Sequence, residues 1–494
     1  MHTSPAANLA DPVLALAGRQ PSAAAVITGE ATVSFAHLNN LVGKAAARLR
    51  QSNGETFGFR FKDQFLHLVF VLGAFRCSAP HVSLFANWPD SMGVDLVAQT
   101  GAGILFGDEA WTGGGEMHVV SLAALEGDAV PADETLPQSA RDGRLLYVLG
   151  SGTTGKPRII CYDATNLAAM IARDLSVRPI GFQERYYSLV RFEYFTGKRR
   201  TLGCLAAGGT VIFTEFPVPA TAIYDQLGAD HLSMVVGQAE AILDKLDGDG
   251  PRFPKLKSLV VGSSPVSETL RQRLRDGLSP NLFIGYGTNE FGEATFAGGE
   301  TQMAHPGSLG FPAPGVELKI AGPDGTALPA GTTGEIHLRA EGMFSGYLND
   351  PEATNAAFAD GWYRPGDLGA LSEDGALVFQ GRVDDLMIRY GTNIYPREIE
   401  QTLEAIEGVR HAAAFPLTSK NEWQIPVAAV TLVDGSGTQA DLDHFCNELT
   451  GICDERLGPK APAHIWIIKH MPRNEAGKIR KNDLAALVAK EMNR

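Results

Sequence analysis

One segment of this sequence carries glycines, hydroxyls and a lysine at a spacing that suits a phosphate group. Gly150-Ser151-Gly152-Thr153-Thr154-Gly155-Lys156-Pro157 follows the apolar run Leu145–Leu149. Glycines free the backbone to present N–H groups to anions, the three hydroxyls add donors, and the lysine adds positive charge. A strand, glycines, hydroxyls and a lysine coincide here, so the segment predicts a polyphosphate-binding loop and not an ordinary flexible turn.

The residue after the lysine separates two kinds of nucleotide-binding protein. A P-loop NTPase needs Ser or Thr at that place to hold Mg²⁺, and this chain has Pro157. The order Ser-Gly-Thr-Thr-Gly-Lys-Pro resembles instead the signature loop of the acyl-adenylate-forming (AMP-binding) superfamily, which includes acyl-CoA ligases, adenylation domains and luciferases. The resemblance implies that the loop binds ATP through Ser151, Gly152, Thr153, Thr154, Gly155 and Lys156.

Two later segments extend the resemblance in the order that the family shows. Gly262-Ser263-Ser264-Pro265 resembles the adenine-side loop, and Tyr286-Gly287-Thr288-Asn289-Glu290 resembles the tyrosine-glycine-x-threonine-glutamate motif. By this resemblance Tyr286 stacks on adenine and Glu290 helps to hold Mg²⁺. An aromatic face suits a purine, and a hard cation takes oxygen ligands. Asn289 replaces the usual threonine but keeps a polar donor for phosphate.

The next motifs supply a ribose contact and a catalytic lysine. Trp362-Tyr363-Arg364-Pro365-Gly366-Asp367 resembles the segment whose aspartate accepts hydrogen bonds from the ribose hydroxyls, a task that suits an acceptor-only carboxylate. Arg382 is expected to contact ribose or phosphate. In the Gly-containing loop near the C-terminus, Lys478 matches the lysine that bridges the substrate carboxylate and the α-phosphate. Its charge would stabilise the transition state.

The resemblance also implies a hinge and a thiol-acceptor region. Asp384, in Gly381-Arg382-Val383-Asp384-Asp385, lies where the family has its hinge residue, and Gly391 begins the segment on the thiol-acceptor side. In the family the small domain rotates after adenylation, which removes the lysine and admits the thiol. The implied reaction is attack of a carboxylate on the α-phosphorus of ATP, release of pyrophosphate, and acyl transfer to a thiol.

The acyl pocket leaves two interpretations open. We place Glu193, Tyr194 and Gly285 on the substrate side. Glu193 stands where many relatives have an aromatic residue or histidine, and where amino-acid-activating relatives have an aspartate. Because a buried carboxylate needs a partner, Glu193 either binds a cationic group of the substrate or pairs internally with Lys198, Arg199 or Arg200.

The identity of the thiol acceptor also leaves two interpretations. The segment Gly391-Thr392-Asn393-Ile394-Tyr395-Pro396 resembles the matching segment of carboxylate–CoA ligases more than that of peptide-synthetase adenylation domains. The acceptor is CoA or a separate acyl carrier protein, and the basic residues Lys478, Arg480 and Lys481 could meet either anion. A stand-alone amino-acid adenylation enzyme, a luciferase-type oxygenase and a non-catalytic nucleotide- or acyl-binding protein are the alternative functions.

The elements that must position these residues predict an α/β fold. Helical segments (35–50, 65–75) alternate with short apolar runs (24–27, 103–106, 145–149, 211–213, 259–261 and 282–284), as in a sheet packed on both faces. Residues 307–346 read as a smaller, antiparallel, barrel-like section. After Gly381 the sequence pattern changes, and it predicts helices at 396–405 and 439–456 and strands at 411–415, 425–431 and 464–468. We therefore predict a large domain over 1–383 and a small mobile α+β domain over 384–494.

Composition excludes several classes of protein. The chain has 494 residues and a formal net charge of −14, so it is a poor general binder of nucleic acid, whose affinity comes largely from neutralising phosphates. Its apolar stretches are too short to span a bilayer, and we read no signal peptide in residues 1–11. The five cysteines do not have metal-ligand spacing. We expect free thiols and a cytoplasmic location.

Overall fold

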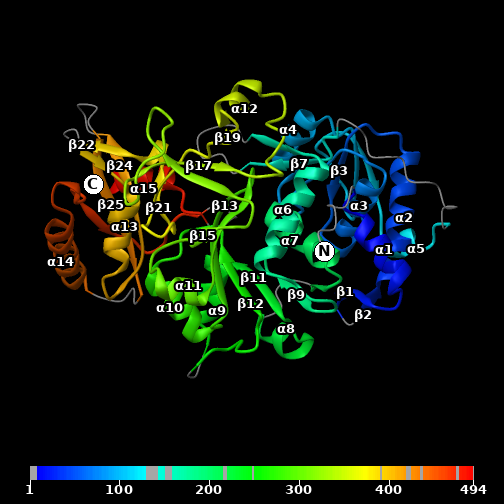
Figure 1. The fold of residues 1–494 in the computed structure, drawn as a ribbon, viewed down its shortest axis with the longest axis horizontal. Coiled ribbons are helices and arrows are strands. Elements are labelled where there is room, and N and C mark those ends of the chain that lie inside the picture. Colours follow the sequence, from blue (N-terminus) through cyan, green and yellow to red (C-terminus); the bar gives the residue numbers. More distant parts are fainter. Residues whose placement is uncertain are drawn as a thin grey trace.

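A computed structural model gives the structure of the chain over residues 8–29, 31–129, 143–150, 158–214, 220–246, 250–389, 392–418, 424–433, 438–473 and 478–492. The molecule is elongated, with the first sheet at one end of the long axis and the C-terminal domain at the other (Figure 1). Strands β11 to β13 lie between them. Two predicted segments fall outside the described residues, namely residues 151–157 and Gly391.

The first sheet belongs to the N-terminal part of the chain and is parallel except for its last strand. Its order is β6-β5-β3-β4-β7-β8, and β8 runs antiparallel to β7. The strands are β3 (Phe57–Arg60), β4 (His81–Ser83), β5 (Ile104–Gly107), β6 (Glu116–Val119), β7 (Leu146–Leu149) and β8 (Ile159–Tyr162). The predicted phosphate loop lies between β7 and β8.

The helices associated with this sheet are α1 (Asp11–Arg19), α2 (Phe35–Gln51), α3 (Gln64–Arg76), α4 (Asp90–Thr100) and α5 (Leu122–Glu126). Helix α3 is apolar on all its faces, as expected of a helix enclosed by the protein. Every residue from Phe65 to Arg76 is buried. The Asp63 carboxylate caps its N-terminus by accepting from the backbone N–H groups of Phe65 (2.8 Å) and Leu66 (3.2 Å).

The second and larger sheet carries most of the predicted site. Its order is β15-β14-β13-β12-β11-β9-β10-β1-β2. The strands are β1 (Ala24–Thr28), β2 (Ala31–Ser34), β9 (Arg185–Ser188), β10 (Thr210–Phe213), β11 (His231–Val235), β12 (Ser258–Gly262), β13 (Leu282–Thr288), β14 (Gly292–Ala297) and β15 (Phe311–Pro312). The central strands are parallel, and β13 and β14 form an antiparallel hairpin.

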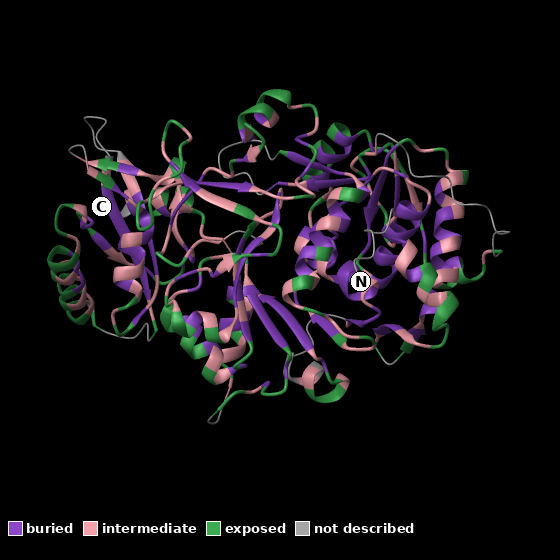
Figure 2. Cartoon of the chain, viewed as in Figure 1, coloured by how far each residue is buried: buried purple, intermediate pink, exposed green. Residues whose placement is uncertain are grey.

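Helices cover both faces of this sheet, as Figure 2 shows from the buried strands between partly exposed helices. They are α6 (Ala164–Val177), α7 (Phe195–Ala206), α8 (Ala220–Leu227), α9 (Val236–Leu243), α10 (Glu268–Gly277) and α11 (Gly299–Ala304). Strand β11 shows the alternation of side chains between the faces. Leu232 and Met234 pack with Leu270 of α10 in one core, whereas Ser233 bonds to Arg200 of α7.

An antiparallel section follows, as predicted for residues 307–346 and extending beyond them. It contains β16 (Glu317–Ala321), β17 (Gly334–Arg339), α12 (Pro351–Ala357), β18 (Phe358–Ala359), β19 (Trp362–Tyr363), β20 (Asp367–Leu371) and β21 (Leu377–Arg382). All of its pairings are antiparallel. Strand β20 begins at Asp367 and β21 ends at Arg382, which the register places opposite each other.

The C-terminal domain is a small α+β unit. Its elements are the 3₁₀ turn η1 (Val383–Asp385), β22 (Met387–Arg389), β23 (Thr392–Ile394), α13 (Pro396–Glu404), β24 (Val409–Thr418), β25 (Gln424–Leu432), α14 (Gln439–Leu457), η2 (Gly458–Lys460), β26 (Ile465–Ile467) and α15 (Lys481–Met492). It has its own apolar cores, one with Ile399 and Leu449 and one with Phe415 and Leu484.

The predicted fold class is confirmed: a large N-terminal α/β domain with a small antiparallel section precedes a small C-terminal domain. All five cysteines are free of disulfide bonds. Within the described residues, no helix is both long and apolar enough to cross a lipid bilayer.

Candidate functional site

A cavity of about 2080 Å³ brings together residues from both domains. It collects predicted residues that are separated by more than 280 positions in the sequence. Its lining includes the predicted residues Glu193, Tyr194, Gly262, Ser263, Ser264, Pro265, Gly285, Tyr286, Gly287, Thr288, Asn289, Glu290, Asp367, Arg382, Asp384 and Lys478. The predicted residues Ser151 to Lys156 and Gly391 lie outside the described residues.

Tyr286 and Asp367 form a buried pair in this cavity. The Tyr286 hydroxyl donates to Asp367 Oδ2 at 2.6 Å, and the Tyr286 ring lies 6.0 Å from the ring of Phe379. Burial raises the pKa of the Asp367 carboxyl, against the lowering effect of Arg382, of the Tyr286 hydrogen bond and of Lys478. The carboxylate proposed for ribose therefore adjoins the ring proposed for adenine.

Lys478 reaches this pair from the C-terminal domain. Burial lowers the pKa of Lys478, and the charges that act on it are those of Asp367, Arg382 and Glu290. Arg382 Nη1 lies 3.8 Å from Asp367 Oδ1, and its Nη2 donates to the carbonyl of Pro365 at 3.2 Å. Two cations and two carboxylates from four separate segments thus meet at one place in the cavity.

Glu290 lies at the turn of the β13–β14 hairpin, among tyrosines. The Tyr347 hydroxyl donates to Glu290 Oε1 at 3.1 Å, and the Tyr162 hydroxyl donates to the carbonyl of Asn289. Burial and the Glu290 charge raise the pKa values of Tyr162, Tyr347 and Tyr363. These phenols stay protonated, and the Tyr347 hydroxyl is the one that donates to the carboxylate and orients it.

Close backbone packing explains the two glycines of the same strand. A Cβ on Gly285 would lie 2.4 Å from the carbonyl oxygen of Thr295, and one on Gly287 would lie 2.4 Å from that of Gly292. Real Cβ atoms do not approach so closely, so only glycine fits at either place. The hairpin can therefore present Tyr286 and Glu290 to the cavity at the edge of the sheet.

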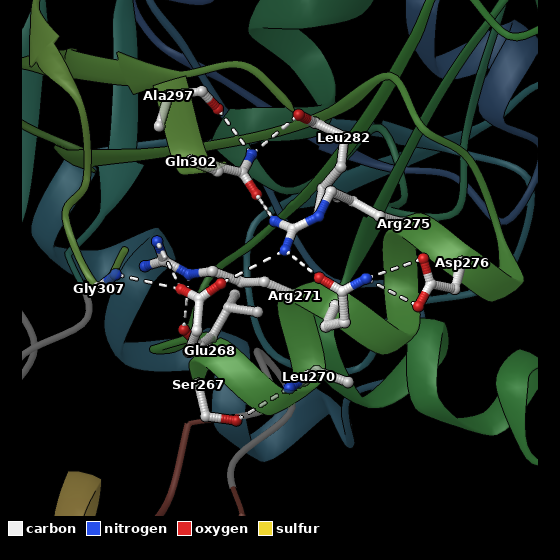
Figure 3. Close-up of polar contacts among 12 residues, drawn as sticks. Ser267, Glu268, Leu270, Arg271, Arg275, Asp276, Leu282, Ala297, Gln302 and Gly307 are labelled. Atoms are coloured by element: carbon white, nitrogen blue, oxygen red, sulfur yellow. Dashed lines mark hydrogen bonds and ion pairs between the residues drawn. The ribbon is translucent and has the colours of Figure 1, made fainter. Parts of the chain in front are cut away.

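The adenine-side loop runs from the end of β12 into α10, and a polar network fixes it (Figure 3). Ser263 has a positive φ of 72°, and the Ser267 hydroxyl caps α10 by accepting from Leu270 N–H at 3.3 Å. Glu268 accepts from Gly307 N–H at 3.1 Å. These bonds join the loop and α10 to the segment that leads to β15.

Glu193 has an internal partner that the sequence analysis did not consider. Arg191 Nε donates to Glu193 Oε1 at 2.6 Å, and the Glu193 side chain is 2% exposed. Lys198, one of the partners considered, forms no direct bond with Glu193. The negative charge of Glu193 nevertheless acts to raise the pKa of Lys198. Glu193 Oε2 is buried with no hydrogen-bond partner among the described residues. Tyr194 packs its ring 4.7 Å from that of Phe85.

The sequence analysis missed Lys198 as part of a buried polar chain. Lys198 Nζ donates to the Ser83 hydroxyl, whose oxygen lies 2.8 Å from His67 Nε2. Burial lowers the pKa of Lys198 to about 7 and holds that of His67 well below its usual range. Since Ser83, His67 and Lys198 come from β4, α3 and α7, spacing along the chain carried no signal of this contact.

Contacts between the domains lie beside the cavity. Arg410 of β24 pairs with Asp244, which follows α9, and His411 Nε2 lies 3.3 Å from Glu240 Oε1. Within the small domain, near the predicted hinge, Lys481 Nζ lies 3.7 Å from Asp385 and 3.1 Å from Glu400. Charged side chains therefore hold the small domain where Lys478 enters the cavity.

Two family models match the chain. The model described as "AMP-binding enzyme" matches residues 15–348, and "AMP-binding enzyme C-terminal domain" matches residues 398–478. The chain is 27% identical to an indoleacetate–CoA ligase of Aromatoleum aromaticum, over 96% of this chain and 97% of that protein. It is 29% identical to a 2-succinylbenzoate–CoA ligase of Geobacillus kaustophilus, over 95% and 96% of the two proteins.

The fold also resembles solved structures. One is the o-succinylbenzoate coenzyme A synthetase of Bacillus subtilis in complex with ATP and magnesium ion, with a TM-score of 0.82 and 23% identity over 96% of this chain and 98% of that one. At this identity the likeness concerns the fold.

Proposed function

Because the chain belongs to the AMP-binding enzyme family, in which its relatives are acid–CoA ligases, we propose that it activates a carboxylic acid with ATP. The products of the first step are an acyl-adenylate and pyrophosphate. In the second step the acyl group passes to the thiol of CoA or of a carrier-protein phosphopantetheine. The observation that carries the proposal is the meeting of Lys478 with Asp367, Arg382 and Glu290.

The nucleotide is assigned to the part of the cavity around Tyr286. Its adenine would lie between the Tyr286 ring and the 262–265 loop, and its ribose hydroxyls would donate to Asp367 in place of, or beside, the Tyr286 hydroxyl. The loop 151–156 would hold the phosphates by the chemistry of its glycines and hydroxyls. The arrangement uses an aromatic face, an acceptor-only carboxylate and backbone donors, which match the three parts of ATP.

Mg²⁺ fits the residues present. Glu290 offers a carboxylate at the cavity wall, oriented by Tyr347, and Mg²⁺ in nucleotide enzymes is held by one or two carboxylates together with phosphate oxygens. When bound, the ion would neutralise charge on the polyphosphate. We assign its protein ligand to Glu290.

The residues of the chain do the rest of the first step by position and charge. The substrate carboxylate is already ionised near neutral pH, so no strong general base is needed. Lys478 would draw this carboxylate to the α-phosphate and offset the negative charge that the two anions bring together. As the carboxylate oxygen bonds to phosphorus, the bond to the bridging oxygen of pyrophosphate breaks and pyrophosphate takes the electron pair.

We further propose that residues 1–383 and 384–494 move relative to each other about Asp384 for the second step, as relatives of this kind do. Lys478 would then leave the cavity, and the segment that begins at Gly391 would replace it. The thiol attacks the mixed anhydride and AMP leaves. Breaking the Arg410–Asp244 and His411–Glu240 contacts would accompany the rotation.

The first test measures pyrophosphate released from ATP and Mg²⁺ with a panel of fatty, aromatic, dicarboxylic, α-amino and β-amino acids. With Lys478→Ala we expect release to fall by about 100- to 1000-fold, the usual effect of removing a group that stabilises transition-state charge. ATP binding, measured by calorimetry, should change far less. A variant as active as the wild type would contradict the role of Lys478.

An amino-acid substrate is the second candidate, because Glu193 Oε2 is a buried acceptor with no partner among the described residues. Its test is Glu193→Gln with α-amino acids beside the corresponding acids that lack the amino group. A selective loss on the amino acids would support it. An equal loss of activity with the amino acids and with the acids that lack the amino group would mean that Glu193 serves mainly to hold Arg191.

A further inference from the structure

A cluster of buried charges lies on the acyl side of the cavity, between α7 and the β13–β14 hairpin. Arg199 and Arg200 of α7 both reach Glu293 Oε1, at 3.4 Å and 2.9 Å. Glu293 Oε2 passes over Gly285, where it would lie 3.2 Å from an added Cβ. All four residues line the cavity. The cluster therefore adjoins the place where the substrate side was predicted.

Positive charge exceeds negative charge in this cluster. The cations are Arg173, Arg178, Arg199 and Arg200. The carboxylates that act on them are Asp174, which Arg178 and Arg199 contact at 3.1 Å and 2.9 Å, and Glu293. Asp174 and Glu293 are the carboxylates among the main influences on the pKa values of Arg173, Arg178 and Arg200. Four guanidinium groups thus share two carboxylates.

This excess of positive charge is energetically costly because the guanidinium groups are removed from water. The Arg199 and Arg200 side chains are 4% and 12% exposed. The Nε atoms of Arg173, Arg199 and Arg200 are buried and have no hydrogen-bond partner among the described residues. Buried charges are normally paired. Arg199 and Arg200 of this cluster line the cavity, so an anion that enters it could offset part of the excess positive charge.

Lys198 adds a further buried donor on the same side. It lines the cavity beside Ser83, to which it donates, whereas Glu193 Oε1 accepts from Arg191. A long apolar acyl chain placed here would cover Arg200 and Lys198 without satisfying them. A compact acid with a polar far end would satisfy them.

Building on the proposed function, we propose that the acid this enzyme activates carries a second carboxylate, and that Arg200, with Arg199, receives it. The first carboxylate faces Lys478 and the α-phosphate. The second shares the two guanidinium groups with Glu293, because a guanidinium has five N–H donors and can serve two carboxylates. The substrate class is a short dicarboxylic acid.

The test compares straight-chain dicarboxylic acids, from malonate to adipate, with their monomethyl esters, which keep the length but lose the second charge. Pyrophosphate release is measured for the wild type and for Arg200→Met. We expect the wild type to prefer one diacid over its ester, and Arg200→Met to lower kcat/KM for that diacid by about 100-fold, as for other truncated buried charge pairs. The ester should be affected much less.

Two further variants separate recognition from a purely structural role. Glu293→Gln removes the internal competitor for Arg200, so we expect KM for the diacid to fall, whereas a structural role predicts equal loss on diacid and ester together with a lower melting temperature. Arg339→Met, which breaks an exposed pair with Glu317, is the control for loss of an arginine elsewhere. If Arg200→Met does not fold, Glu293→Gln still decides.

The outcomes distinguish this inference from the proposed function. Lys478-dependent activity with monocarboxylic acids, and no preference for a diacid, would overturn the inference and leave the proposed function standing. If no acid is turned over, titration of the diacids into the AMP-loaded enzyme by calorimetry decides. Binding that Arg200→Met abolishes would support the anion site, and the absence of binding by any diacid would overturn it.

Discussion

Single residues in the cavity are held in environments that change their ionisation. Lys198 is 2% exposed and is surrounded by Ser83, His67, His81, Glu193 and, beyond Glu193, Arg191. Burial keeps both histidines uncharged, with the pKa of His81 lowered to about 3. Glu193 is therefore the charge that favours protonated Lys198, and burial outweighs it.

Removing the Lys198 amine should stabilise the fold in a pH-dependent way. The pKa of Lys198 falls from 10.5 to about 7 on folding, so folding disfavours the proton. The destabilisation is absent above about pH 10.5, grows as the pH falls, and is complete below about pH 7. We expect Lys198→Met to raise the free energy of unfolding by on the order of 1–4 kcal/mol near pH 7 and by little near pH 10.

The measurement is urea denaturation followed by fluorescence at several pH values. Lys62→Met is the control, because Lys62 is exposed and pairs with Glu109; its effect should be within about 0.5 kcal/mol at every pH. A gain from Lys198→Met that does not depend on pH would mean that packing, and not ionisation, sets the stability at this position.

At the scale of secondary structure, the β13–β14 hairpin and α10 support the part of the cavity proposed for the nucleotide. Gln302 of α11 donates to the carbonyls of Leu282, at the start of β13, and Ala297, at the end of β14, both at 2.9 Å. Its Oε1 accepts from Arg275 of α10 at 3.0 Å. Figure 3 shows how this one amide joins the three elements. Tyr286 and Glu290 thus depend on a residue that does not line the cavity.

Replacing Gln302 should loosen this support. Gln302→Leu leaves two buried carbonyls and one guanidinium N–H without their partner, which should cost about 2–4 kcal/mol. Denaturation by urea should begin at a lower concentration, and KM for ATP should rise because Tyr286 and Glu290 lose their fixed placement. Gln272→Leu on the exposed face of α10 is the control, because it removes another acceptor of Arg275 but leaves both carbonyl bonds of Gln302 in place. If both variants behave alike, the Gln302 network is not what positions the hairpin.

At the scale of the whole molecule, the placement of the small domain decides which of its residues line the cavity proposed for the nucleotide. Lys478 lies at the cavity while Arg410 and His411 pair with Asp244 and Glu240 of the large domain. Partly exposed ion pairs of this kind contribute about 0–1 kcal/mol each. Such weak contacts allow the domain to be held in one orientation and still move to another within a catalytic cycle.

Asp384→Pro tests the proposed hinge, because proline fixes φ near −65° and so restricts rotation at this position. We expect pyrophosphate release in the first turnover to change little and thioester formation to fall by roughly tenfold or more, equivalent to about 1.4 kcal/mol in the barrier. Single-turnover assays with acyl-AMP and CoA measure the second step alone. Asp384→Ala removes the same side chain without restricting the backbone and should be near wild type. Loss of adenylation alone would place the hinge elsewhere.

The sequence by itself was sufficient for the fold class and the family, and most of the residues that it predicted for the nucleotide lie along one cavity. These depend on local patterns: apolar runs ending at glycine-rich loops predicted β7 and β12, and motifs such as 286–290 and 362–367 are continuous segments. The close approach of Thr295 to Gly285 and the positive φ of Ser263 were not predicted from these segments and emerged only from the structure.

Only the tertiary structure decided the partners. Ser83 as the partner of Lys198, and the sharing of Glu293 by Arg199 and Arg200, join α7 to β4 and β14, which are far from it in sequence. Charge and hydrogen-bond energies depend on distances of a few ångströms and on burial. Neither quantity is encoded in a local pattern, so the character of the acyl pocket emerged only when the sheets and helices were packed together.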